Sequence, residues 1–181
     1  MHSPADSVVR SGKSLAVHIV FALLLYALAS LLLSHFDTAS EAMREQYEET
    51  EVLQLLAGAR ATIVGWYVAA LAISWLCSTV FLVTANLKRP HVRSKSDARK
   101  AMPVWIAMFV VAIVATAFLW WRQVSLADVA STLLDDDYLL LATAGYVGTA
   151  LAFWLGTGLA VALTLKPSVP MASTALPEIW N

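Results

Sequence analysis

Few residues in this sequence could hold a cofactor or catalyse a reaction, and His18 is the first to consider. It is the only ionisable side chain clearly inside a long apolar run, and a histidine in such a run can ligate haem iron. His35 follows 17 residues later on the same predicted helix, about 25 Å away at 1.5 Å per residue, so the two cannot share one iron. We predict that His18 is a hydrogen-bonded structural residue, with haem or quinone binding there as the weaker alternative.

The other reactive residue types lack the partners that catalysis or metal binding requires. Cys77 is the only cysteine, which excludes an intramolecular disulfide, a Cys-x-x-Cys redox pair and a thiolate metal cluster. The sequence contains no Gly-x-Ser-x-Gly, no His-Glu-x-x-His and no phosphate-binding glycine loop. We therefore expect no catalytic residues, no metal site and no resident cofactor.

Four long apolar runs define the elements that carry these residues. They cover residues 14–36, 61–85, 102–121 and 138–165, and each meets the requirement of about 20 residues for a membrane-spanning helix. The sequence predicts an all-α, polytopic integral membrane protein with four transmembrane helices in one bundle, residues 1–166. Residues 167–181 contain three prolines and are predicted to form a flexible cytoplasmic tail.

Charged residues are segregated between the two sides of these runs. Nine of the twelve lysines and arginines lie in the amino-terminal arm, the middle connection and the tail. Ten of the thirteen acids lie in the other two connections. Because cytoplasmic connections carry the excess of lysine and arginine, we expect both termini in the cytoplasm and the protein in the bacterial inner membrane.

The two acidic connections are predicted to form short amphipathic helices outside the membrane. Thr38-x-x-Glu41 has the pattern of a capping box, and Ser125-x-x-Asp128 has the same pattern before the last run. A helix from residue 40 onward would place four glutamates on one ridge, which is either a solvated face or a surface for a basic partner or a divalent cation. These residues are Glu41, Glu45, Glu48 and Glu49.

The middle connection carries six cations in thirteen residues, Lys88, Arg89, Arg93, Lys95, Arg99 and Lys100. Membrane orientation alone accounts for such a cluster, and the next explanations are contact with anionic lipids and contact with a cytoplasmic partner. Nucleic acid is not expected as a partner, because no aromatic residues for base stacking are interspersed with these cations.

The last run has the strongest packing pattern. Small residues recur there every fourth position, which allows close approach of helices in lipid, either within the chain or between copies in a homo-oligomer. These residues are Ala144, Gly148, Ala152, Gly156 and Ala160. Tryptophans are also frequent, and Trp105, Trp120 and Trp121 are predicted to anchor the ends of the third run at the membrane interface.

Between the ends of the runs there is no Asp, Glu, Lys or Arg, which disfavours proton-coupled transport. We expect a non-enzymatic protein that acts by association, as a subunit or regulator of a membrane complex of, for example, an immunity or defence type. The alternative is a homo-oligomeric channel or membrane-perturbing effector lined by hydroxyl groups. Those candidates are Ser30, Ser34, Ser74, Ser78, Thr79, Thr116, Thr149 and Thr157.

Overall fold

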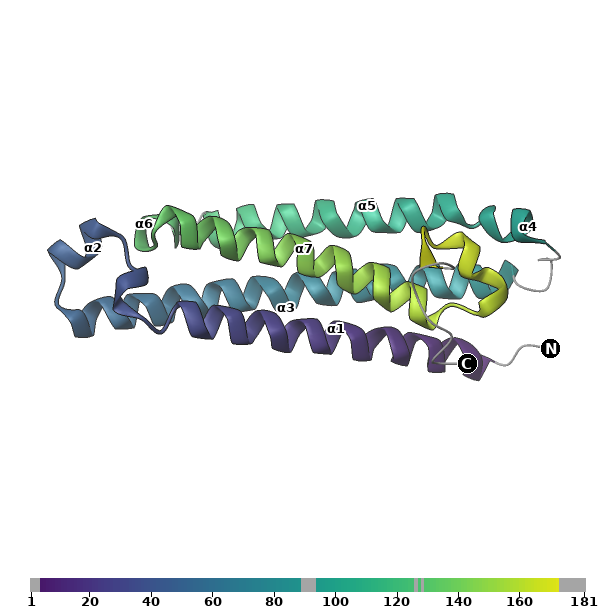
Figure 1. Cartoon of the computed structure of the whole chain (residues 1–181), viewed down its shortest axis with the longest axis horizontal. Helices are drawn as coiled ribbons and strands as arrows, with labels where there is room; N and C mark the ends of the chain where they lie inside the picture. Colours follow the sequence, from purple (N-terminus) through teal and green to yellow (C-terminus); the bar gives the residue numbers. More distant parts are fainter. Residues whose placement is uncertain (1–3, 89–93, 126, 128, 173–181) are drawn as a thin grey trace.

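The computed structural model describes residues 4–88, 94–125, 127 and 129–172, and these residues form an all-helical bundle without a β-strand. The long helices are α1 (Pro4–Leu32), α3 (Glu49–Lys88), α5 (Met102–Leu119) and α7 (Asp135–Ala160). Consecutive long helices run in opposite directions, so the four lie side by side as an up-and-down bundle (Figure 1). All four belong to segments long and apolar enough to cross a membrane, which confirms the predicted fold class.

Helix α3 is longer than a bilayer crossing requires. Its 40 residues extend about 60 Å at 1.5 Å per residue, against about 30 Å for the hydrocarbon core. Since residues 49–88 form one unbroken helix, α3 must continue well beyond the membrane at one end or at both. The expectation that the second run begins as a helix outside the membrane agrees with this length.

Helices α3 and α7 form the centre of the bundle. Helix α1 packs against both of them, and α5 packs against both from the other side. Two buried apolar clusters fill the interior. One surrounds Leu56, Trp66 and Leu141 towards the acidic end, and the other surrounds Phe81 and Phe153 towards the basic end.

The acidic end is closed by a small cap made from both acidic connections. It contains the 3₁₀ turn η1 (Phe36–Thr38), α2 (Glu41–Gln46), the π-helical turn η3 (Trp120–Ser125) and α6 (Val129–Thr132). Backbone hydrogen bonds join the two connections, from Ser40 N to Thr132 O at 3.1 Å and from Leu134 N to Thr38 O at 3.0 Å. The cap is therefore a single packed unit, here called the outer cap because the sequence predicts both of its connections outside the membrane.

The capping box predicted at Thr38 is wrong, because Thr38 does not begin the helix that contains Glu41. Thr38 lies in η1 and its hydroxyl donates to Leu32 O at 2.7 Å, while Ser40 occupies the position before α2 and its hydroxyl donates to Ser131 O at 2.8 Å. Ser125 ends η3, and Asp128 lies outside the described residues. The hydroxyl of Thr38 is thus used on the end of α1, and that of Ser40 on the other connection of the cap.

The last predicted run also ends too late, because α7 stops at Ala160 and the chain turns at Val161 into the 3₁₀ helix η4 (Leu163–Ser168). The segment 161–172 folds back across the basic end of the bundle, where it contacts α4 (Lys95–Arg99) and α5. Val169 and Ala172 are buried there, and Trp154 Nε1 donates to Pro170 O at 2.7 Å. Residues 167–172 of the predicted tail are thus packed and belong to this segment 161–172, which we call the floor of the bundle. Residues 173–181 lie outside the described part.

Candidate functional site

His18 lies at the junction of α1, α3 and α7 and is only 3% exposed. Its Nδ1 is 2.8 Å from the carbonyl oxygen of Ser14, and its Nε2 is 3.0 Å from the hydroxyl of Ser74. Because a carbonyl can only accept, Nδ1 carries a proton, and in the neutral ring Nε2 accepts from the Ser74 hydroxyl. Both ring nitrogens are thus engaged in hydrogen bonds within the bundle.

Further hydroxyls continue from His18 along the interface between α1 and α3. Ser14 Oγ lies 2.7 Å from Ser78 Oγ, and Ser78 Oγ donates to Trp75 O at 2.9 Å. The Ser78 proton is thus used on Trp75, so Ser14 is the donor to Ser78. Ser11 Oγ and Thr79 Oγ1 form the next pair at 2.9 Å. We call this row of paired groups on α1 and α3, from His18 to Ser11, the polar seam.

Gly156 of α7 covers the polar seam. A Cβ at this position would lie 2.8 Å from Ser14 Oγ and 3.0 Å from His18 Cε1, so the seam fits only against a residue without a side chain. One turn further along the chain, Ala160 O accepts a hydrogen bond of 2.9 Å from Arg10 Nη1. Helix α7 is therefore held to α1 by close packing and by a charged donor at its last carbonyls.

The small residues of α7 pack within the chain. Gly148, Ala152, Gly156 and Ala160 are buried, and a Cβ at Gly148 would lie 3.0 Å from a methyl group of Leu25 on α1. Ala144 is partly buried. At Gly148 and Gly156 the ridge lies directly against α1. Gly145, outside the repeat, makes a second close approach, to the rings of Trp66 and Tyr67.

Tryptophans make buried contacts that the sequence did not predict. Trp105, predicted at the membrane interface, is only 6% exposed, and its Nε1 donates to Thr157 Oγ1 at 2.9 Å. Trp66 is fully buried and donates from Nε1 to Thr116 O at 3.0 Å. Only Trp121 of the predicted anchors is largely exposed, with Trp120 packed against Trp66. Hydropathy alone does not distinguish a core tryptophan from an interfacial one.

Most candidate pore-lining hydroxyls point into the bundle. Ser74, Ser78, Thr116, Thr149 and Thr157 are buried, and all except Thr149 hydrogen bond to groups of the same chain. The remaining candidates are Ser30 and Thr79, which are partly buried, and Ser34, which is exposed and donates to Leu31 O. In the part of the chain that the structure describes, large buried side chains such as Trp66, Phe81 and Phe153 occupy the interior where a pore through one copy would run.

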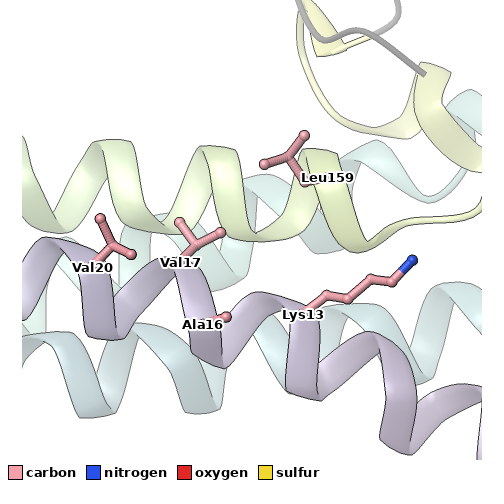
Figure 2. Close-up of a pocket in the computed structure, with 5 residues that line it drawn as sticks. All are labelled: Lys13, Ala16, Val17, Val20 and Leu159. Atoms are coloured by element: carbon pink, nitrogen blue, oxygen red, sulfur yellow. The ribbon is translucent and has the colours of Figure 1, made fainter. Parts of the chain in front are cut away.

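Grooves run along both sides of α1 in the half of the bundle that contains the polar seam. One, of about 310 Å³, lies between α1 and α3 and is lined by Leu15, His18 and Trp75 among others. Another, of about 150 Å³, lies between α1 and α7. Figure 2 shows its lining, with Ala16, Val17 and Val20 in succession on α1 and Leu159 across from them. The Lys13 side chain extends along this groove away from Val20.

The four glutamates predicted to share a ridge are all exposed but do not lie on one helix. Glu41 and Glu45 belong to α2, the chain is extended at Tyr47, and Glu49 begins α3. The break occurs because α2 packs into the outer cap through Met43. The glutamates still share the acidic end, together with the three aspartates in the first turn of α7, Asp135, Asp136 and Asp137.

The described cations of the middle connection lie at the opposite end. Lys95, Arg99 and Lys100 are exposed on or beside α4, and Lys100 Nζ forms an ion pair of 2.8 Å with Asp97. Lys88 ends α3, while Arg89 and Arg93 lie outside the described residues.

No metal-binding arrangement is present among the described residues, where no three of His, Cys, Asp and Glu come together. Cys77 is buried on α3. The chain matches no protein-family profile, no curated protein and no solved structure.

Proposed function

We propose that this protein is a non-enzymatic helical bundle of the bacterial inner membrane that acts by association, as a subunit or regulator of a membrane complex. The observation that supports the proposal is that the polar seam is hydrogen bonded within the chain, whereas charged side chains are exposed at the ends of the bundle. The buried polar groups of the seam are used on one another, which leaves none of them aimed at a substrate. The outer cap, in contrast, holds many exposed carboxylates on a hydrogen-bonded frame.

The charge distribution supports an orientation with both termini in the cytoplasm. The described cations Lys95, Arg99 and Lys100 lie at the end of the bundle that also holds Arg10, and the glutamates lie at the other end (Figure 1). Lysine and arginine are retained on the cytoplasmic side during insertion. The outer cap then faces away from the cytoplasm and is the surface that a partner outside the membrane would meet.

The outer cap has the features of a docking surface for a basic partner. Glu45 is exposed, and Tyr47 and Leu53 are 38% and 37% exposed close to it in the chain, which adds apolar area beside the carboxylates. Complementary charge speeds and orients association, while apolar area stabilises the bound state. Because the two connections are hydrogen bonded to each other, this surface loses little conformational entropy on binding.

Site-specific photo-crosslinking in native membranes tests the proposal. A crosslinker in place of Glu45 should give one discrete adduct with another protein, and one in place of Val110, on the lipid-facing side of α5, should give none. Changing the four glutamates Glu41, Glu45, Glu48 and Glu49 to glutamine should weaken the association, with D135N/D136N as the matched acidic control. A purified protein that turns over a substrate, or equal crosslinking from both positions, would overturn the proposal.

A further inference from the structure

We propose that one transmembrane helix of the partner protein lies along the exposed face of α3 and carries a lysine or arginine where it reaches the outer cap. This inference rests on the proposed function, because it names the part of the partner that this chain binds within the membrane. Two hollows between α1 and α3 mark the position. One, of about 310 Å³, is lined by residues of α1 between 15 and 22, and the other, of about 370 Å³, by residues of α1 between 8 and 12. Trp75 lines both, so the hollows follow one another along the same pair of helices.

The α3 side of these hollows belongs to a longer row of small residues. Gly58, Gly65, Ala72 and Thr79 recur every seventh residue, and the first three are exposed. Seven residues make about two turns, so these positions share one face, and a second helix can follow them with a slight left-handed supercoil. From Gly58 to Thr79 is 21 residues of α3, about 32 Å at 1.5 Å per residue. One lipid leaflet with its headgroups is only about 20 Å thick, so a helix can cover the whole row and a single lipid cannot.

The two glycines of this row lack a packing partner among the described residues. A Cβ at Gly58 or Gly65 would meet nothing within 4 Å. In contrast, a Cβ at Gly148 or Gly156 of α7 would lie 3.0 Å or less from a side chain of α1. Glycine inside a helix costs about 1 kcal/mol relative to alanine, and close packing offsets that cost in α7. A helix of another protein would offset it in α3, because glycine lets helix backbones approach closely in lipid.

Charge indicates which helix fits the row. Glu51 lies seven residues before Gly58, on the same face of α3, and both Glu51 and Glu48 are exposed at the outer cap. The cation Arg60 lies two residues after Gly58, which places it on the other side of the helix. A helix on the row therefore ends beside carboxylates, which a lysine or arginine complements. A second copy of this chain fits less well, because copies with the same orientation in one membrane would bring their acidic caps together.

Photo-crosslinking in native membranes tests this inference. A crosslinker in place of Ala72 should give an adduct with the same protein that the crosslinker at Glu45 reaches. Mass spectrometry of this adduct should place the link in an apolar segment of about 20 residues with a lysine or arginine at its outer end. Val110, 51% exposed on α5, is the control position and should give no protein adduct.

The outcomes separate this inference from the proposed function. A link from Ala72 to a second copy or to lipid alone, together with an adduct from Glu45, would overturn the helix site and leave the proposed function standing. If neither position gives an adduct with another protein, both are wrong.

Two exposed alanines provide a matched pair of variants. Ala72→Leu fills the row and should reduce the yield of the Glu45 adduct at least about fivefold, as expected for overpacking at a close helix contact. Ala107→Leu makes the same change on the exposed side of α5 and should leave the yield unchanged. The unfolding free energies of both variants should stay near that of wild type, which distinguishes a lost partner from a lost fold. Equal yields from the two variants would overturn the site.

A second pair of variants tests the charge. Glu51→Gln should lower the yield of the Ala72 adduct about twofold, as expected for one exposed ion pair. Asp136→Asn, at an exposed carboxylate on α7, should leave it unchanged. Equal effects of these two changes would overturn the expected cation on the partner helix.

Discussion

Replacing Gly156 by alanine should destabilise the bundle, because the added methyl group would enter the polar seam. Its carbon would lie 2.8 Å from Ser14 Oγ and 3.0 Å from His18 Cε1, closer than an unstrained contact allows. Overpacking of this kind costs about 1–3 kcal/mol. Displacing Ser14 and His18 strains two hydrogen bonds, each worth about 0.6 kcal/mol in a membrane protein. The higher helix propensity of alanine returns about 1 kcal/mol, so the expected net loss is about 1–3 kcal/mol.

Gly65 provides the matched control for this substitution. It lies in the middle of α3, and a Cβ there would meet nothing within 4 Å. Gly65→Ala should therefore be neutral or should stabilise the protein by up to about 1 kcal/mol through helix propensity. The two glycine-to-alanine changes are chemically identical, and only the surroundings of the new methyl group differ.

A double mutant separates the clash from other effects of Gly156→Ala. Ser14→Ala removes the oxygen that the new methyl group would meet, at the cost of one hydrogen bond to Ser78, about 0.6 kcal/mol. The double variant should be more stable than the sum of the two single effects predicts, by at least about 1 kcal/mol.

Equilibrium unfolding in mixed micelles with increasing SDS, followed by near-ultraviolet circular dichroism, gives these free energies. If Gly156→Ala is as mild as Gly65→Ala, α1 and α7 are not in close contact at this point. If the effects of Ser14→Ala and Gly156→Ala simply add, the methyl group does not press on the seam and the geometry argued for it is wrong.

Three further results are expected. In a variant without the native cysteine, cysteine in place of Glu45 should react with a membrane-impermeant maleimide in intact spheroplasts, and cysteine in place of Lys100 only after permeabilisation; the reverse would overturn the orientation. Val169→Asp should cost more than about 2 kcal/mol because it buries a carboxylate in the floor, whereas Met171→Asp, at a side chain 73% exposed, should change the unfolding free energy little. Trp66→Phe should lose about 1 kcal/mol with the bond to Thr116 O, measured by the same unfolding assay.

The spans could be predicted from the sequence because the physical requirement is simple. A chain in lipid must satisfy its backbone hydrogen bonds internally, so each apolar run of sufficient length becomes a helix. The fourth run, predicted to continue to residue 165, is an exception, because the helix ends before the apolar residues do. Leu165 is apolar and 1% exposed, but it belongs to the floor under the bundle and not to α7. Hydropathy reports burial and does not distinguish a spanning helix from a buried turn.

The candidate site was only partly predictable for a different reason. The repeat of small residues indicated a close helix contact, and His18 was expected to be hydrogen bonded, as it is. The partner Ser74 lies 56 residues away on another helix, so its pairing with His18 depends on how α1 and α3 are rotated against each other. The same dependence explains why Trp105 was expected at an interface and lies in the core.

The polar seam fixes the position of α1 along the bundle axis, which the apolar contacts of α1 do not fix. The small residues of α7 repeat every turn, so α1 shifted by one turn, about 5.4 Å, would make similar apolar contacts with α7. Such a shift would break the pairs that His18, Ser14 and Ser11 form with α3. At about 0.6 kcal/mol each, three broken bonds cost about 1.8 kcal/mol, which favours the observed register roughly twentyfold. Since α1 carries Lys13 and Arg10, the same hydrogen bonds also fix the position of both cations along the bundle axis relative to the end of α7.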